Sequence, residues 1–122
     1  MAGVILVIED NPDNMALMEE ILEDEAYSVL KATRAGEGIE LLKSTGADAV
    51  LMDVSLPDMS GFDATRLIKS DPGLQKIPVI VLTAHAMDSH KRAAFKAGCD
   101  GFLTKPVDEN LLRETLERCI GC

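Results

Sequence analysis

Short apolar runs recur along the chain, separated by longer segments that mix polar and apolar residues. The runs are rich in Val, Ile and Leu and do not alternate with polar residues, which is typical of strands buried on both faces of a parallel sheet. They predict five strands, over residues 4–8, 28–32, 49–52, 77–82 and 101–104.

The segments between the runs show the three- and four-residue spacing of amphipathic helices. Strands that alternate with helices predict an α/β domain, in which five helices cover both faces of a parallel sheet through right-handed crossovers. The fourth helix, expected over residues 89–97, has mainly alanine as its apolar content. We therefore expect it to be the most loosely held of the five.

Several residues mark where the helices begin and end. The expected signals are Asn11 before the first helix, residues 71–73 after the third, Asp88 and Gly98 around the fourth, and Asp108 before the fifth. The inner face of the fifth helix is predicted to carry Leu111, Leu112, Thr115, Leu116 and Cys119.

A length of 122 residues fits one domain, and we expect residues 1–122 to form it. The chain is 47% apolar, and no apolar stretch approaches the roughly 18 residues of a membrane span. The N-terminus carries no basic or apolar leader, so a cytoplasmic location is expected. The net charge of −9 disfavours direct DNA binding and favours a protein partner.

Polar residues that can handle a phosphoryl group stand directly after four of the runs. Glu9 and Asp10 follow the first run, Asp53 the third, Thr83 the fourth and Lys105 the fifth. Ligands of open parallel sheets bind just beyond the carboxyl ends of the strands, so these side chains are expected to converge. Each alone is more simply a turn former, a strand residue or a solvated charge, but together they indicate one site.

The three acids need a counter-ion if they converge. Two carboxylates about 4 Å apart repel by about 4 kcal/mol at an effective dielectric constant near 20. Carboxylates without a neighbouring thiolate or imidazole favour a hard cation, and Mg²⁺ suits a few protein ligands completed by water. Asp53, at the end of the middle strand, is then the candidate nucleophile for an aspartyl phosphate, with Thr83 and Lys105 binding phosphoryl oxygens.

Four separated segments carry a resemblance to a known family: residues 8–11 (IEDN), 51–61 (LMDVSLPDMSG), 82–84 (LTA) and 103–106 (LTKP). In order, spacing and identity they resemble the receiver domains of two-component response regulators. The resemblance spans the whole chain and is to the stand-alone, single-domain type. It implies a flavodoxin-like, doubly wound sheet of five parallel strands in the order 2-1-3-4-5, with five helices.

The resemblance also implies roles for single residues. Asp53 would accept a phosphoryl group from a histidine kinase or a histidine phosphotransfer protein. Glu9, Asp10, Asp53 and the backbone carbonyl of Ser55 would hold Mg²⁺, for which Mn²⁺ can substitute. Glu9 departs from the Asp that is frequent at its position, which bears on metal affinity.

Phosphate binding and a switch are implied as well. Thr83 and Lys105 would bind the phosphate, and the bond between Lys105 and Pro106 is expected to be cis. Phe102 would turn inward when Thr83 moves towards the phosphate. The face formed by the fourth helix, the fifth strand and the fifth helix would then control a downstream protein. His85 is a candidate modulator of phosphate lifetime or a solvent-facing imidazole.

Other interpretations stay open. The chain could be the excised receiver of a hybrid kinase or phosphorelay. A flavin-binding electron carrier would need a loop rich in Gly, Ser or Thr where residues 9–13 are acidic, and a phosphatase of the Asp-x-Asp kind would need an acid in place of Pro12. A receiver supports its own phosphorylation and dephosphorylation, so no separate substrate is expected. Cys119 and Cys122 form a C-x-x-C pair that is most simply two reduced thiols.

Overall fold

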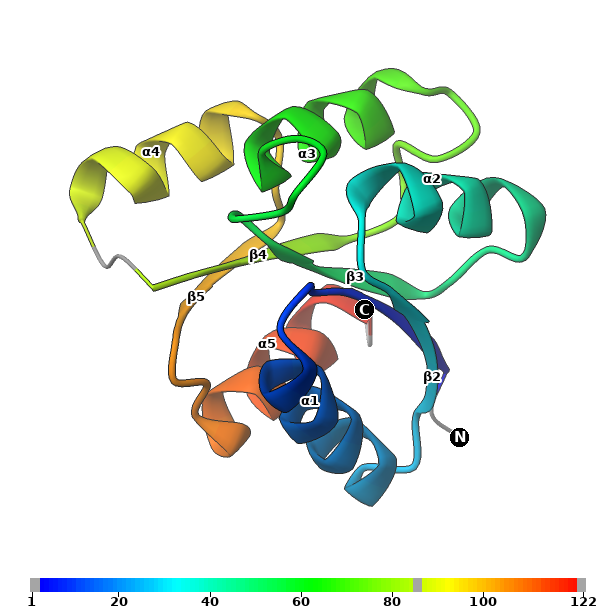
Figure 1. Ribbon diagram of the computed structural model, residues 1–122, viewed down its shortest axis with the longest axis vertical. Helices are drawn as coiled ribbons and strands as arrows, with labels where there is room; N and C mark the ends of the chain where they lie inside the picture. Colours follow the sequence, from blue (N-terminus) through cyan, green and yellow to red (C-terminus); the bar gives the residue numbers. More distant parts are fainter. Residues whose placement is uncertain (1–2, 85–86, 121–122) are drawn as a thin grey trace.

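The computed structural model describes residues 3–84 and 87–120. Strands and helices alternate through this part of the chain (Figure 1). The strands are β1 (Val4–Ile8), β2 (Ser28–Ala32), β3 (Ala49–Asp53), β4 (Val79–Thr83) and β5 (Gly101–Thr104). The helices are α1 (Pro12–Asp24), α2 (Ala35–Ser44), α3 (Gly61–Ser70), α4 (Asp88–Lys96) and α5 (Glu109–Ile120).

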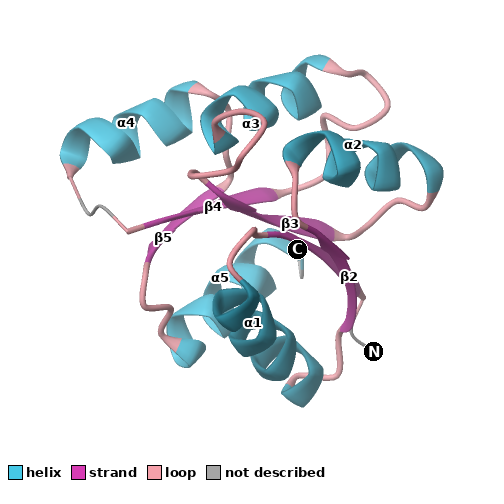
Figure 2. Ribbon diagram, viewed as in Figure 1, coloured by secondary structure: helices cyan, strands magenta, loops and turns pink. Residues whose placement is uncertain are grey.

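The five strands form one parallel sheet in the order β2-β1-β3-β4-β5, which confirms the predicted fold class. Helices α2, α3 and α4 cover one face of the sheet, and α1 and α5 cover the other (Figure 2). Every residue of β3 and β4 is buried, because these central strands have helices on both sides. Burial on both faces explains why their sequences show no alternation.

The carboxyl ends of β1 and β3 lie side by side. Ile8 pairs with Met52 in the parallel register, so the residues that follow them emerge together. On the other side of β3, Asp53 pairs with Leu82, and Thr83 then pairs with Thr104 of β5. The chain order reverses between β1 and β3, and such a switch point is where parallel sheets bind ligands.

Two strand boundaries differ from the predicted ones. The prediction that β4 begins at residue 77 is wrong, because the Ile77 N–H donates to the Leu74 carbonyl in a turn and Pro78 has no N–H to give a ladder. At their other ends, β3 and β4 each continue one residue further than predicted. Asp53 and Thr83 are therefore the last residues of these strands.

Four of the five helix-end signals are confirmed. Helix α3 ends at Ser70, directly before residues 71–73, and Asp71 is its C-cap. The Asn11 side chain accepts hydrogen bonds from the Asp13 and Asn14 N–H groups, and Asp108 accepts one from the Leu111 N–H. Gly98 follows α4 with a φ of 104°, a conformation that favours glycine.

Two predictions about helices are wrong. Asp88 is the first residue of α4 and not its cap, since Met87 occupies the cap position without a side-chain hydrogen bond. Leu111 points outward from α5 and is 49% exposed, while Leu112, Thr115 and Leu116 are buried as predicted.

None of the helices in residues 3–84 and 87–120 has the length and apolar character of a membrane-spanning segment.

Candidate functional site

Three carboxylates meet where β1 and β3 end. One oxygen each of Glu9, Asp10 and Asp53 can be chosen so that all three lie within 4.8 Å of one another. Glu9 and Asp53 are buried, with 1% and 4% of their surfaces exposed, whereas Asp10 is exposed. The predicted convergence of these acids is confirmed, and Asp10 leaves the group open to solvent.

Lys105, directly after β5, lies between the two buried acids. Its Nζ donates to Glu9 Oε1 at 2.7 Å and to Asp53 Oδ1 at 2.9 Å. Glu9 Oε2 also accepts the Asn11 N–H at 3.1 Å, so both oxygens of this carboxylate have partners. The ammonium group therefore serves as a built-in counter-ion for a pair that would otherwise repel.

Burial and hydrogen bonding have opposite effects on the pKa of Glu9 and on the pKa of Lys105. Loss of hydration raises the pKa of Glu9, and the hydrogen bond from Lys105 only partly offsets it. Burial acts to lower the pKa of Lys105, but its hydrogen bonds to Glu9 and Asp53 outweigh this effect and raise the pKa. Lys105 is thus firmly charged at neutral pH.

The donor set fits a hard divalent cation. Three carboxylates against one ammonium leave two negative charges uncompensated, and all the available ligand atoms are oxygen. Oxygen ligands with room for water describe a Mg²⁺ site better than a Zn²⁺ site. A surface hollow of about 410 Å³ lies between α1, the end of β2 and the first turn of α2, and Glu9 and Asp10 line it.

The predicted phosphate-binding residues stand at the neighbouring strand ends. Thr83 ends β4 and is 2% exposed, and its carbonyl accepts the Lys105 N–H at 2.8 Å. Asp53, Thr83 and Lys105 therefore follow one another across β3, β4 and β5. The bond between Lys105 and Pro106 is cis, as predicted.

The loop from β3 to α3 closes on itself next to Asp53. The Gly61 N–H donates to the Val54 carbonyl at 2.9 Å, and Ser55 and Ser60 form an isolated antiparallel bridge. A Cβ at position 61 would collide with the Asp53 carbonyl oxygen and lie 2.8 Å from Val54 Cα. Glycine is therefore required at this close approach, a constraint that the sequence analysis missed.

Asp58, at the tip of this loop, is a second residue that the sequence analysis missed. Its Oδ1 accepts the Ala35 N–H and its Oδ2 accepts the Gly36 N–H, both at 2.9 Å, at the first turn of α2. Arg34, which precedes that turn, provides no side-chain cap. The signal available in the sequence was an arginine where a capping residue is usual.

These hydrogen bonds make stability depend on the charge of Asp58. The Gly36 and Ala35 N–H groups hold the pKa of Asp58 below its ordinary value. A lowered pKa stabilises the fold above the unfolded-state pKa, about 3.9, and this stabilisation is lost as the pH falls through the folded-state pKa. Asp58→Asn should thus lower the free energy of unfolding at pH 7 by up to about 1 kcal/mol, as for a lost helix cap.

Urea unfolding of both proteins between pH 7 and pH 2.5 would measure this difference. It should shrink below about pH 4, near the unfolded-state pKa of Asp. A difference that stayed constant down to the lowest pH would contradict the assignment.

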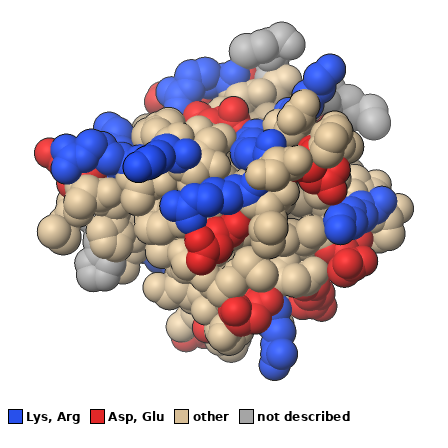
Figure 3. Space-filling model, turned by 90° about the horizontal axis from the view of Figure 1, so that it is seen from above, with Lys and Arg blue, Asp and Glu red and all other residues tan. Residues whose placement is uncertain are grey.

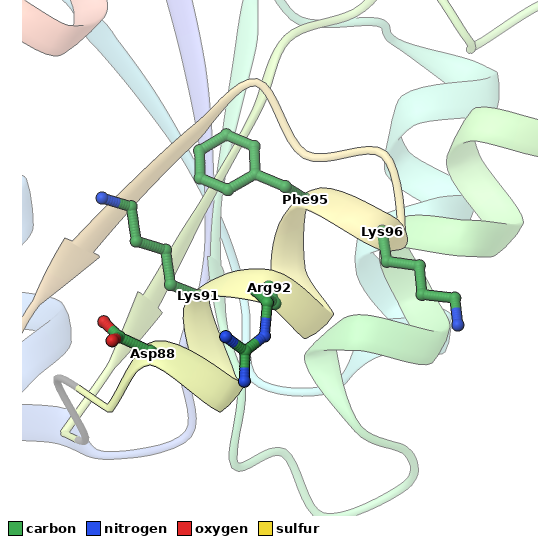
Figure 4. Close-up of a pocket in the computed structure, with 5 residues that line it drawn as sticks. All are labelled: Asp88, Lys91, Arg92, Phe95 and Lys96. Atoms are coloured by element: carbon green, nitrogen blue, oxygen red, sulfur yellow. The ribbon is translucent and has the colours of Figure 1, made fainter.

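Helix α4 presents a basic and aromatic outer face. Lys91, Arg92, Phe95 and Lys96, with Asp88, line a surface hollow of about 510 Å³ (Figure 4). In a chain with 21 acidic and 12 basic residues, α4 carries three basic residues and one acidic residue. Lys and Arg side chains gather over it on the left in the view from above (Figure 3). Only Ala94 of α4 is buried, in line with the predicted weak anchoring.

The remaining candidate residues lie away from the carboxylates or cannot be placed. Phe102 of β5 is half-buried against the core beneath α4. Burial raises the pKa of Cys99 to about 11, so its thiol is protonated at neutral pH. Cys119 is partly exposed, while His85 and Cys122 lie outside the described residues.

Comparisons with known proteins agree with this geometry. The family model of the response regulator receiver domain matches residues 5–117. Protein PilH of Pseudomonas aeruginosa is 38% identical over 117 residues, which cover 96% of this chain and 97% of that protein. The polar-differentiation response regulator DivK of Brucella anthropi is 32% identical over 121 residues, which cover 99% of this chain and 98% of that protein.

A solved structure adds a metal to the comparison. The receiver domain of a sensor histidine kinase of Pseudomonas aeruginosa PAO1 matches with a TM-score of 0.92 and 32% identity over 100% of both chains. That receiver has a magnesium ion coordinated in its active-site cleft.

Proposed function

The chain belongs to the response regulator receiver domain family, and from this we propose that residues 1–122 form one receiver domain whose Asp53 accepts a phosphoryl group. The surroundings of Asp53 support this role. Asp53 is a nearly buried carboxylate at the end of the central strand, 2.9 Å from the Lys105 ammonium and within 4.8 Å of Glu9 and Asp10. This is an acceptor held between a cation and a site suited to a second cation.

The donor in this proposal is a phosphohistidine of a histidine kinase or of a histidine phosphotransfer protein. An Asp53 oxygen forms a bond to phosphorus as the P–N bond breaks, and the electron pair of that bond returns to the imidazole nitrogen. The Lys105 ammonium and the Thr83 hydroxyl bind the phosphoryl oxygens. In the reverse half of the cycle, water attacks phosphorus, inorganic phosphate leaves and the Asp53 carboxylate is restored.

Glu9, Asp10, Asp53 and the Ser55 carbonyl would hold the divalent cation, Mg²⁺ or in its place Mn²⁺. When bound, the cation neutralises charge between the attacking carboxylate and the phosphoryl group. Lys105 then has a part that does not need the metal: it keeps two carboxylates close together before the donor arrives.

Membership of the receiver family also suggests where the protein acts and what it binds. A receiver of this kind acts in the cytoplasm through protein partners, without DNA contacts of its own and without a separate substrate. The second candidate is the receiver of a hybrid kinase or phosphorelay. The full-length match to a receiver from a sensor histidine kinase favours that candidate. Family membership argues against the flavin carrier and the phosphatase.

Intact mass after incubation with acetyl phosphate tests the proposal. The protein with Mg²⁺ should gain one phosphoryl group, and the same mixture with EDTA should gain none. Asp10→Asn should need at least about tenfold more Mg²⁺ for the same phosphorylation, because one carboxylate ligand is lost. Equal phosphorylation with EDTA would contradict the metal site.

The face formed by α4, β5 and α5 is proposed to bind and control a downstream protein. The weak burial of α4 and its exposed Phe95, beside Lys91, suit a surface that changes with phosphorylation and binds a protein (Figure 4). Thr83, at the end of β4, and Phe102, on β5, are the proposed links from the phosphate to this face.

In Thr83→Ala, phosphorylation of Asp53 should no longer alter the structure of α4. We expect phosphorylated wild-type protein to show altered amide hydrogen exchange over residues 88–96, and the phosphorylated variant to show little alteration. Thr45→Ala, an exposed position after α2, is the control and should behave as wild type. The same altered exchange in phosphorylated Thr83→Ala would rule out the role of the Thr83 hydroxyl.

A further inference from the structure

We infer that Asp58 is a positioning residue, which fastens the loop between β3 and α3 to helix α2 and so presets the Ser55 carbonyl for the metal. The inference rests on the proposed function, since it concerns the loop beside the proposed cation site. It assigns a task to a residue that belongs neither to the carboxylate group nor to the phosphate-binding residues.

The contacts of Asp58 reach across the fold. Its two oxygens accept the N–H groups of Ala35 and Gly36, which lie 23 and 22 residues earlier in the chain. Both N–H groups belong to the first turn of α2, where helical N–H groups have no partner within the helix and where the dipole favours an anion. Bonds from N–H groups to an ionised carboxylate are stronger than bonds between neutral groups.

The helix offers no substitute for this cap. Arg34 has the extended backbone of a cap residue but makes no side-chain hydrogen bond to the helix. The Glu37 side chain accepts the Thr33 N–H at 3.0 Å and so satisfies a group before the helix, not the first turn itself. The first turn of α2 therefore depends on a carboxylate from a different loop.

The loop is held at two places, and Asp58 provides one of them. At its base, the Gly61 N–H binds the Val54 carbonyl and Ser55 is bridged to Ser60. At its tip, Asp58 is fastened to α2. A loop fixed at both places has less conformational freedom to lose when a ligand binds, and this lowers the cost of binding. Ser55 belongs to the attachment at the base and precedes Asp58 in the loop.

The effect of the Asp58 contacts on Mg²⁺ binding must be separated from the effects of helix capping and of net charge. The double variant Asp58→Ala/Arg34→Ser separates them. Serine at position 34 can cap α2 from within its own segment, and the loss of one acid and one base keeps the net charge of the wild-type protein. In that variant α2 is capped, but the loop tip is free.

The experiment measures two quantities for wild type, Asp58→Ala, the double variant and the control Asp24→Asn. Titration calorimetry gives the Mg²⁺ dissociation constant, and amide exchange without metal reports the freedom of residues 55–60. Asp24, exposed in the last turn of α1, matches the charge change without touching the loop. Urea unfolding shows whether α2 capping has been restored.

Asp58→Ala should weaken Mg²⁺ binding by about three- to tenfold, at or below the low end of the range for residues that support metal ligands. The double variant should regain most of the stability yet keep the weakened Mg²⁺ binding and the faster exchange of the loop. Asp24→Asn should match wild type in all three measurements.

Two results would overturn the inference. One is Mg²⁺ affinity in Asp58→Ala equal to that of wild type. The other is affinity and loop exchange that return with stability in the double variant, which would make Asp58 a helix cap alone. Failure of wild type itself to bind Mg²⁺ would overturn the proposed metal site, and loop exchange in the metal-free variants would still show whether the tether exists.

Discussion

Asp53→Asn should lose phosphoryl acceptance, with the rate falling by roughly four orders of magnitude or more, as expected for removal of a nucleophile. The amide has almost the same volume as the carboxylate, so the buried position at the end of β3 stays filled. Lys105 keeps its 2.7 Å bond to Glu9, which holds the ammonium in place. The chemical loss is therefore expected without a loss of the fold.

The measurement is intact mass after incubation with acetyl phosphate and Mg²⁺. Asp24→Asn removes the same functional group from an exposed position and should be phosphorylated like wild type. Circular dichroism of both variants should match wild type. Persistent phosphorylation of Asp53→Asn at the wild-type rate would place the acceptor elsewhere in the chain.

Gly61→Ala should cost about 3 kcal/mol of unfolding free energy, which lowers the melting temperature by roughly 10 °C. The added Cβ would meet backbone atoms, namely the Asp53 carbonyl oxygen and Val54 Cα, and backbone cannot turn aside as a side chain can. Relief requires a shift of the strand end that carries Asp53. We therefore expect Mg²⁺ binding to weaken together with stability.

Gly36→Ala is the matched control for this prediction. Gly36 also lies in the first turn of a helix, but a Cβ there has only the Asp58 Oδ2 atom nearby, at 3.4 Å. Alanine is the better helix former, so this variant should be neutral or more stable by up to about 1 kcal/mol. Thermal unfolding of the two variants compares them directly, and equal stability would show that the space at position 61 is not restrictive.

The convergence of the acids could be predicted because parallel strands present their carboxyl ends at one edge. Runs that end at Ile8 and near Met52 place Glu9, Asp10 and Asp53 at that edge whatever the helices do, and the 4.8 Å cluster confirms it. The two contacts of Lys105 follow from the same rule for β5. The roles of these residues remain predictions.

Features that depend on how elements turn against one another were harder to predict. Leu111 and Leu112 are both apolar, and only the rotation of α5 on the sheet decides that Leu112 is buried and Leu111 exposed. Asp88 is of a residue type that often caps helices. It does not cap α4, because the helix begins at Asp88 itself and Met87 occupies the cap position. Spacing rules describe one element at a time, so they do not specify these outcomes.

The pattern of apolar and polar residues does not predict contacts between segments that lie far apart in the chain. Asp58 stands in a turn-like segment, and nothing local indicates that its partners are the N–H groups of Ala35 and Gly36. The need for glycine at position 61 likewise arises from the Asp53 carbonyl in a neighbouring segment. Both features fix the loop next to the proposed acceptor, so the sequence indicated which residues gather at the site but not the contacts that hold the loop there.

Reduction with borohydride would identify the residue that carries the phosphoryl group, which we propose is Asp53. Borohydride converts an aspartyl phosphate to homoserine with loss of phosphate, so peptide mass spectrometry of the phosphorylated protein locates the acceptor. We predict homoserine at position 53 only, dependent on Mg²⁺ during phosphorylation. Homoserine at position 10 or at another acid, with Asp53 unchanged, would contradict the proposed function.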